Sequence, residues 1–234
     1  MVLCYPMGYE YMQSHRSYRR IADRLAGEGY PVLRFDFYGC GDSDGDMDQG
    51  HISQWRKDIE TAVDQIKKKS EVSRVCLVGF RLGGTLSIMH GSSHGNIDRI
   101  ILLDPVINGK NYLGELADIH ESLLSDSHLT PGPRPKNQLP SEVQGFPLTD
   151  VMITDLMNID LLGTVQKPAD NILIIKSGAD LAKGNFVEHL ETMGVRLSHL
   201  FSDSGLWKDR QAGEILVPVK VLEVMASWMS EVYP

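Results

Sequence analysis

The chain has 234 residues, of which 42% are hydrophobic and 23% are charged, and its formal net charge is −8. This length suits one α/β domain with a buried core, and we predict a single domain over residues 1–234. The acidic balance makes nucleic acid and anionic lipid surfaces poor partners, and no apolar run approaches the ~20 residues that span a bilayer.

The three cysteines, Cys4, Cys40 and Cys76, form no CxxC pair, and the first residues lack a basic leader followed by a long apolar stretch. These features predict a cytoplasmic protein in a reducing compartment. We expect neither a metal site nor a cofactor.

Six short apolar runs rich in β-branched residues predict buried strands at residues 2–5, 31–36, 75–80, 99–104, 171–176 and 196–201. Helical patterns separate them at residues 14–28, 52–69, 83–89, 182–193 and 214–231, and Ser14 is the predicted cap of the first helix. Near-continuous apolar strands are typical of parallel sheets that are covered on both faces. The alternation of strand and helix therefore predicts a doubly wound, mostly parallel α/β sheet.

Residues 109–166 interrupt this alternation. They contain helical patterns near 112–124 and 148–156, separated by a proline cluster at 130–135 that cannot be helix or central strand. We interpret the segment as a helical lid insertion over the carboxyl edge of the sheet. A surface excursion with no role is the alternative.

The most informative segment is the strand 75–80 followed by a helix, with Gly79 and Gly83 flanking Arg81. A strand, a Gly-x-X-x-Gly turn and a helix together form the nucleophile elbow of α/β hydrolases, whose central residue is the nucleophile. The glycines fit such a tight turn, but arginine has no nucleophilic atom at neutral pH because its guanidinium stays protonated.

This segment, the opening Tyr5-Pro-Met-Gly-Tyr-Glu10 and the stretch Arg34-Phe-Asp-Phe-Tyr-Gly-Cys-Gly-Asp-Ser-Asp-Gly45 resemble the α/β-hydrolase superfamily. The resemblance is to its serine-aminopeptidase-like and exosortase-associated hydrolase-like members, in a branch with arginine in place of the nucleophilic serine. It implies an α/β-hydrolase fold. It also implies that the loop of Met7 and Gly8 supplies an oxyanion-hole amide, and Leu82 after the elbow centre is a further candidate ligand contact.

The same resemblance implies where the rest of a catalytic triad would stand. Asp180, after the strand 171–176, matches the place of the acid. The histidine would follow the last strand, but residues 202–209 contain none and Trp207 is a candidate pocket wall there. The nearest histidine, His199, falls within the strand pattern. Ordinary Ser-His-Asp hydrolysis is therefore not expected.

Arg81 at the start of a helix could instead grip a carboxylate, a phosphate or an acyl ligand, free or bound to a carrier. Alternatively it pairs with Asp180 or with Asp104, which ends a strand at the edge where ligands of α/β sheets bind, and so closes the site. Glu10 and His15 flank the predicted oxyanion loop and could act as acid or base.

Three functions stay open from the sequence. The first is a degenerate hydrolase-fold protein that binds a small acyl or anionic ligand in the old pocket. The second is an enzyme of altered mechanism, an ester or thioester hydrolase, lyase or isomerase, that uses Arg81, Glu10 or His15. A displaced nucleophile at Cys40 is a minor variant of it. The third is a structural or interaction protein that uses the fold only as a surface. A homodimer is possible with any of the three.

Overall fold

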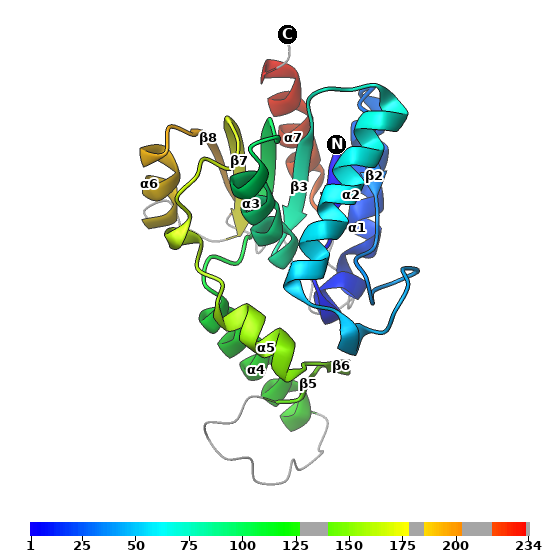
Figure 1. Ribbon diagram of the computed structural model, residues 1–234, viewed down its shortest axis with the longest axis vertical. Coiled ribbons are helices and arrows are strands. Elements are labelled where there is room, and N and C mark those ends of the chain that lie inside the picture. The colour runs from blue at the N-terminus through cyan, green and yellow to red at the C-terminus, as the bar shows by residue number, and fades with distance from the viewer. Residues whose placement is uncertain (127–139, 178–184, 203–216, 233–234) are drawn as a thin grey trace.

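The structure is a computed structural model that describes residues 1–126, 140–177, 185–202 and 217–232 (Figure 1). Its main sheet has six parallel strands in the order β2-β1-β3-β4-β7-β8. The strands are β1 (Val2–Cys4), β2 (Leu33–Arg34), β3 (Cys76–Phe80), β4 (Arg99–Leu103), β7 (Asn171–Ser177) and β8 (Arg196–Ser202). The six predicted strands are confirmed, although β2 is much shorter than the pattern at 31–36 predicts.

Helices cover both faces of this sheet, as a doubly wound fold requires (Figure 1). One buried cluster joins the sheet to α1 (Gly8–Gly27) and α7 (Val219–Val232). The other joins it to α2 (Ile52–Ser70), α3 (Leu82–His94) and α6 (Asn185–Thr192). The predicted α/β class and the parallel sheet are confirmed.

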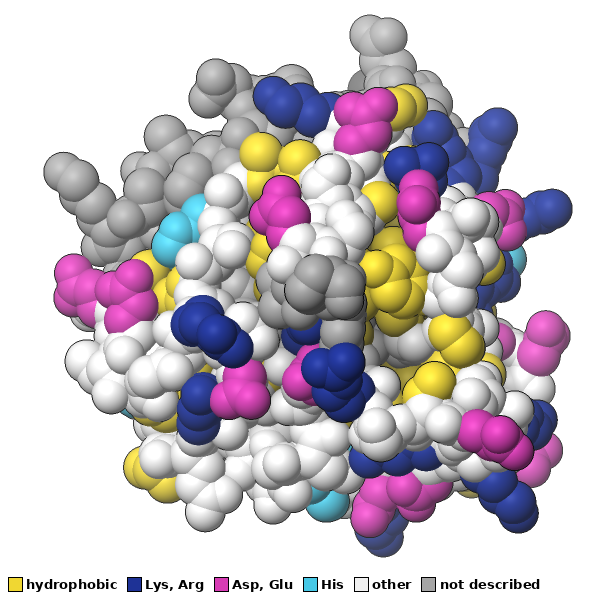
Figure 2. Space-filling view, turned by 90° about the horizontal axis from the view of Figure 1, so that it is seen from above, with side chains coloured by type: hydrophobic (Ala, Val, Ile, Leu, Met, Phe, Trp, Pro, Cys, Tyr) yellow, Lys and Arg dark blue, Asp and Glu magenta, His cyan; other side chains and the backbone are white. Residues whose placement is uncertain are grey.

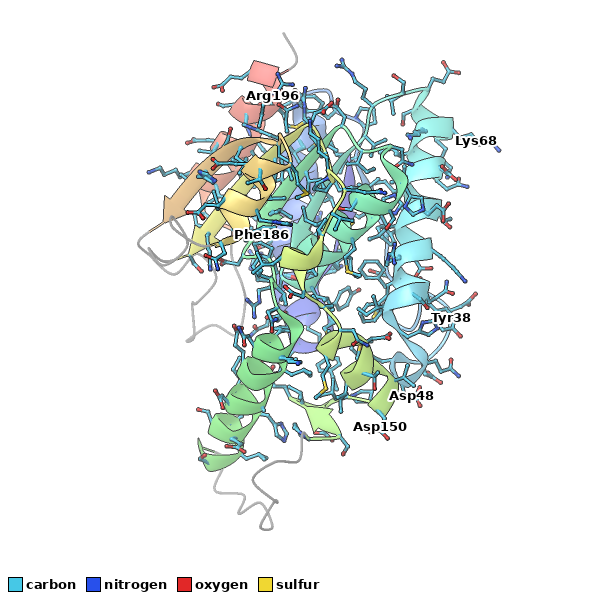
Figure 3. The ribbon with its side chains drawn as sticks, turned by 60° about the vertical axis from the view of Figure 1, so that its left-hand side comes forward. Tyr38, Asp48, Lys68, Asp150, Phe186 and Arg196 are labelled. Carbon is cyan, nitrogen blue, oxygen red and sulfur yellow. The ribbon has the colours of Figure 1, made fainter. Side chains whose placement is uncertain are left out.

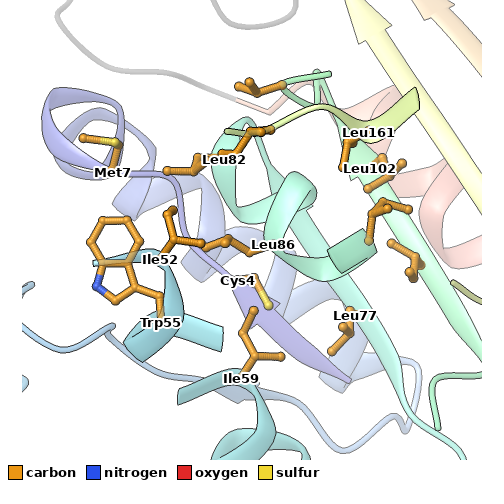
Figure 4. Packing of buried hydrophobic residues seen from close by; sticks show 14 of the residues in the cluster. Cys4, Met7, Ile52, Trp55, Ile59, Leu77, Leu82, Leu86, Leu102 and Leu161 are labelled. Carbon is orange, nitrogen blue, oxygen red and sulfur yellow. The ribbon is translucent and has the colours of Figure 1, made fainter. Parts of the chain in front are cut away.

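Side chains of the central strands alternate between the two clusters. On β4, Ile100 and Leu102 belong to the cluster with α2 and α3, whereas Ile101 and Leu103 belong to the cluster with α1 and α7. All four side chains are fully buried, which is why the run is apolar without interruption. Figure 4 shows Leu102 in the cluster with α2 and α3, together with residues of these two helices.

The first helix begins earlier than the sequence predicts. It starts at Gly8, with Met7 as an extended N-cap residue that has no side-chain cap, and Ser14 is not a cap. Ser14 lies buried inside the helix, where its hydroxyl donates to the carbonyl of Tyr11 over 3.2 Å. Serine is a common N-cap residue, so the sequence pattern suggested that the helix begins at Ser14. A serine can also satisfy its hydroxyl on the backbone inside a helix, as Ser14 does here.

A segment outside the main sheet lies between β4 and β7. It contains α4 (Gly109–Asp126), the short strands β5 (Glu142–Val143) and β6 (Phe146–Pro147), α5 (Asp150–Met157) and the 3-10 turn η2 (Leu161–Gly163). In Figure 1 it extends from the edge of the sheet at which the strand arrows end. The two predicted helices are confirmed, while the proline cluster at 130–135 lies outside the described residues.

The inserted segment is attached to the body through the start of α2. The backbone N–H of Ile52 donates to Oδ2 of Asp155 on α5 over 2.9 Å, and β6 contacts the 3-10 turn η1 (Met47–Gln49). Figure 3 shows Asp48 of η1 and Asp150 of α5 at the same end of the molecule. The insertion therefore lies beside the carboxyl edge of the sheet and contacts the body there.

The opposite end of the molecule carries side chains of both charges. Figure 2 shows basic and acidic groups interspersed on this face, with no broad area of a single sign. Among the residues that the structure describes, no helix combines the length and apolarity that crossing a bilayer would need.

Candidate functional site

The turn between β3 and α3 has the geometry of a strained elbow. Its tip is Arg81, a non-glycine residue with φ of 50° and ψ of −121°. Backbone contacts explain both flanking glycines. A Cβ on Gly79 would lie 2.4 Å from the carbonyl carbon of Gly83, and one on Gly83 would lie 2.1 Å from the carbonyl oxygen of Cys4. The predicted strand–turn–helix is confirmed, and such strain in a tight turn is typical of functional sites.

The turn is held by two neighbouring strands. The Arg81 N–H donates to the Leu103 carbonyl over 2.9 Å. The Tyr18 hydroxyl donates to the Cys4 carbonyl over 2.5 Å and accepts from the Phe80 N–H over 3.0 Å. One buried tyrosine of α1 thus joins β1 and β3 immediately before the turn.

The guanidinium of Arg81 is clasped by two carboxylates. Its Nε donates to Oε1 of Glu10 on α1 over 2.9 Å, and its Nη2 pairs with Oε2 of Glu115 on α4. The other oxygen of Glu10 accepts from the Tyr112 hydroxyl over 2.8 Å, and the Tyr112 ring lies 5.1 Å from the guanidinium carbon. A single cluster therefore connects the elbow, the first helix and the inserted segment.

The two carboxylates differ in their exposure to solvent. The side chains of Arg81 and Glu10 are 19% and 17% exposed, but that of Glu115 is 54% exposed. Burial raises the pKa of Glu10, opposed by the Arg81 charge and the Tyr112 hydrogen bond. Burial alone would lower the pKa of Arg81, but the Glu10 carboxylate and its neighbours outweigh it and raise that pKa. The guanidinium therefore stays charged.

Asp104 lies directly beside the elbow, because Phe80 and Leu103 are register partners on β3 and β4. It also has a positive φ, of 42°. Both its oxygens are occupied by Ser177, which donates from its N–H over 2.9 Å and from its hydroxyl over 2.6 Å. Burial raises the pKa of Asp104, against the opposing effect of these hydrogen bonds.

The sequence correctly required a carboxylate for Arg81, but the partner it suggested within the described residues, Asp104, was wrong. The ion pairs of Arg81 there are with Glu10 and Glu115. Asp180 and Trp207 lie outside the described residues.

His15 is not part of the cluster around Arg81. It lies on the exposed side of α1, where its ring faces Tyr5 at a centroid distance of 6.2 Å. His199 lies within β8, as predicted, but its side chain is exposed. Cys40 is buried rather than accessible, and this burial raises its pKa to about 12. A thiol in that state is a poor nucleophile.

Met7, Gly8 and Leu82, which the resemblance placed around an oxyanion hole, are buried. Met7 and Leu82 belong to the same buried cluster, which Figure 4 shows. Leu82 is the first residue of α3, and the first N–H groups of a helix have no acceptor within it. Those amides and the helix dipole favour an anion at this corner.

Sequence reasoning missed Tyr112 and Glu115. Their spacing of three residues places them on one face of the predicted helix, but nothing in the chain connects that face with a residue 34 positions earlier. Only the folded position of the inserted segment reveals the contact.

Comparison of the chain with known proteins identifies its family. The family model of Serine aminopeptidase, S33 (Hydrolase_4) matches residues 11–143, which is more than half of the chain. The chain therefore belongs to this family, and its fold is that of the α/β hydrolases.

Individual relatives agree with that assignment. The bovine palmitoyl-protein thioesterase ABHD10, mitochondrial, is 36% identical over 58 residues, which are 25% of this chain and 18% of that protein. The structure of Est1E from Butyrivibrio proteoclasticus with bound ferulic acid has a TM-score of 0.66 at 22% identity. The match covers 98% of this chain and 87% of the Est1E chain. The structure of mouse ABHD10 has a TM-score of 0.61 at 13% identity. The match covers 99% of this chain and 88% of the mouse chain. The structural likenesses concern the fold.

Proposed function

We propose that the protein forms no covalent serine intermediate and instead binds a small acyl carboxylate, or another anion, at Arg81 beneath the inserted segment. One observation carries this proposal. The elbow tip, where a nucleophile would stand, holds a guanidinium that already pairs with a carboxylate on each of two sides. Arginine cannot attack a carbonyl, but its planar fork suits a carboxylate well.

The position of Glu115 suggests how a ligand enters. Its side chain is half-exposed, so its pairing with Arg81 contributes little to stability. A ligand carboxylate that takes its place keeps the guanidinium paired, and the dipole at the start of α3 favours its negative charge. Glu10 is more deeply buried and holds the other edge of the guanidinium through this exchange.

The inserted segment would act as a lid in this process. Glu115 and Tyr112 both belong to α4, so displacing Glu115 loosens the attachment of α4 to the elbow. One cavity beside Glu10 has a volume of about 20 Å³ and is lined by Gly8, Leu116 and Phe146 among others. That volume holds about one water molecule, so an acyl chain that enters this cavity would push α4 and the β5–β6 hairpin outward.

Binding of hexanoate, measured by titration calorimetry, tests the proposal. Acyl carboxylates are the first choice because the bovine relative named above is a palmitoyl-protein thioesterase. We expect Glu115→Gln to bind hexanoate several-fold more tightly than the wild type, since an internal competitor is removed. Arg81→Gln should bind at least about tenfold more weakly, because a charged hydrogen-bond donor is lost.

Glu121→Gln is the matched control, since it removes one exposed acidic charge from the same helix. If it tightens binding as much as Glu115→Gln, the effect is general electrostatics and the exchange mechanism is wrong. Labelling of the wild-type protein by a fluorophosphonate would contradict the absence of a serine nucleophile.

A second candidate function is hydrolysis or elimination with Glu10 as general base. The raised pKa of Glu10, beside the predicted oxyanion loop, favours it. Its two hydrogen bonds to Arg81 and Tyr112 count against it, because they engage both oxygens. Turnover of an ester or thioester that Glu10→Gln abolishes and Arg81→Gln retains would establish this alternative.

A further inference from the structure

A second hollow lies far from the elbow, between α2, the end of α3 and the segment after α5. It has a volume of about 410 Å³ and is lined by Arg56, Met89, Ser92, Ser93, Asn158, Ile159, Asp160, Leu161, Gly163, Thr164, Val165 and Gln166. This volume is within the range of small-molecule sites. Ser92 is ten residues beyond Leu82 on α3, which corresponds to about 15 Å along the helix axis.

The polar groups of this hollow include serine and threonine hydroxyls, two side-chain amides and one cation, Arg56. Nη2 of Arg56 donates to the Ser93 hydroxyl over 2.6 Å. Arg56 Nε and the Ser92 hydroxyl are buried without a hydrogen-bond partner among the described residues. Arg56 also has no ion pair within that part of the chain. Buried donors without acceptors cost free energy, so an acceptor brought by a ligand would be favoured.

One acidic residue, Asp160, also lines the hollow, but its carboxylate has a structural role. Its Oδ1 accepts from the N–H of Leu162 over 3.1 Å and so caps η2. The remaining walls are apolar, with contributions from Met89, Ile159 and Leu161. The hollow thus combines a positive end with an apolar body.

We propose that this hollow is a second ligand site, for a small organic anion with an apolar body. The anionic group would lie on the guanidinium of Arg56 and the hydroxyl of Ser92, because the Ser93 hydroxyl already donates to the Met89 carbonyl over 2.9 Å. The apolar part would cover Met89 and Ile159. The site uses no residue of the Arg81 cluster, so it does not depend on the function proposed above.

Phenyl phosphate is a suitable probe, because it joins an anionic group to a single ring. We expect it to shift the amide resonances of residues 92–93 and 158–166 in ¹H–¹⁵N spectra, and Arg56→Gln to weaken its binding about tenfold or more. Lys57→Gln removes one positive charge from the next residue of α2, which is exposed, and should leave binding unchanged.

Val165 provides a second test that does not depend on Arg56. Its side chain is 88% exposed at the rim of the hollow, so both Val165→Lys and Val165→Glu should fold. We expect the lysine variant to bind phenyl phosphate more tightly and the glutamate variant more weakly. The proposal is overturned if shifts are confined to residues near Arg81, if none occur, or if Arg56→Gln and Lys57→Gln bind equally well.

Discussion

Nε of Arg81 donates to Oε1 of Glu10 over 2.9 Å and joins two residues that are 71 positions apart in the chain. Both side chains are less than one-fifth exposed, whereas Glu115, the second partner of Arg81, is more than half exposed. The same guanidinium therefore makes one sheltered and one solvated ion pair. This asymmetry predicts different energetic roles for the two carboxylates.

Replacing Glu10 should destabilise the protein far more than replacing Glu115. Glu10→Gln leaves a sheltered guanidinium without its main counter-charge, which we expect to cost about 2 kcal/mol of unfolding free energy. Glu115→Gln should cost less than about 0.5 kcal/mol, the usual value of an exposed pair. Urea unfolding of both variants at neutral pH measures the difference, and equal losses would mean that exposure does not decide the strength of these pairs.

Arg81→Ser alone should not create an esterase. A serine at the elbow needs a base, and residues 203–216, which follow the last strand, contain no histidine. The described His15 faces Tyr5 on the surface of α1. We expect p-nitrophenyl butyrate cleavage by this variant to stay near the background rate. An increase of several orders of magnitude, with fluorophosphonate labelling of the new serine, would show that another group acts as base.

The Tyr18 hydroxyl should contribute measurably to stability, because it serves two buried backbone groups at once. Tyr18→Phe removes the acceptor of the Phe80 N–H and the donor to the Cys4 carbonyl, at an expected cost of about 2 kcal/mol. Tyr38→Phe is the matched control, since its hydroxyl makes an exposed hydrogen bond with Gln49. Thermal unfolding of both variants should show a clear loss for the first and almost none for the second.

The fold could be predicted from the sequence because its evidence is local. The run Ile100–Leu103 is buried on both faces, and such a run between turn signals is typical of a parallel strand covered by helices on both sides. The elbow was equally readable, since Gly79 and Gly83 are required by backbone contacts within a few residues or with the adjacent strand. The start of α1 was missed because Met7 gives no capping signal.

The site itself was only half readable. The cost of an unpaired guanidinium predicts that Arg81 has a carboxylate partner, but not which of the 31 acidic residues it is. Glu10 was identified as a candidate acid or base, and its pairing with Arg81 depends on how α1 packs against the elbow. The ion pair between Glu115 and Arg81 depends on the position of the whole inserted segment, which no local sequence pattern specifies.

Acid should destabilise the protein through His90. This side chain is fully buried on α3 and its ring stacks on that of His94 at a centroid distance of 4.2 Å. Burial, reinforced by the charges of His94 and Arg56, lowers the pKa of His90 from 6.5 to about 4. The unfolded chain therefore takes up this proton at a higher pH than the folded one. The contribution of His90 to stability is complete above pH 6.5 and is lost as the pH falls toward 4.

The size of this loss follows from the pKa difference and is roughly 3 kcal/mol. Because burial raises the pKa of Glu10 and Asp104, those two groups act in the opposite direction as the pH falls. The pH dependence of the unfolding free energy must therefore be compared between the wild type and a variant that lacks His90. We expect the unfolding free energy of the wild type, measured in urea, to fall more steeply with decreasing pH than that of His90→Leu. His94→Gln, which changes the more exposed ring of the stacked pair, should retain most of the slope. Parallel curves for the wild type and His90→Leu would show that His90 is not the titrating group.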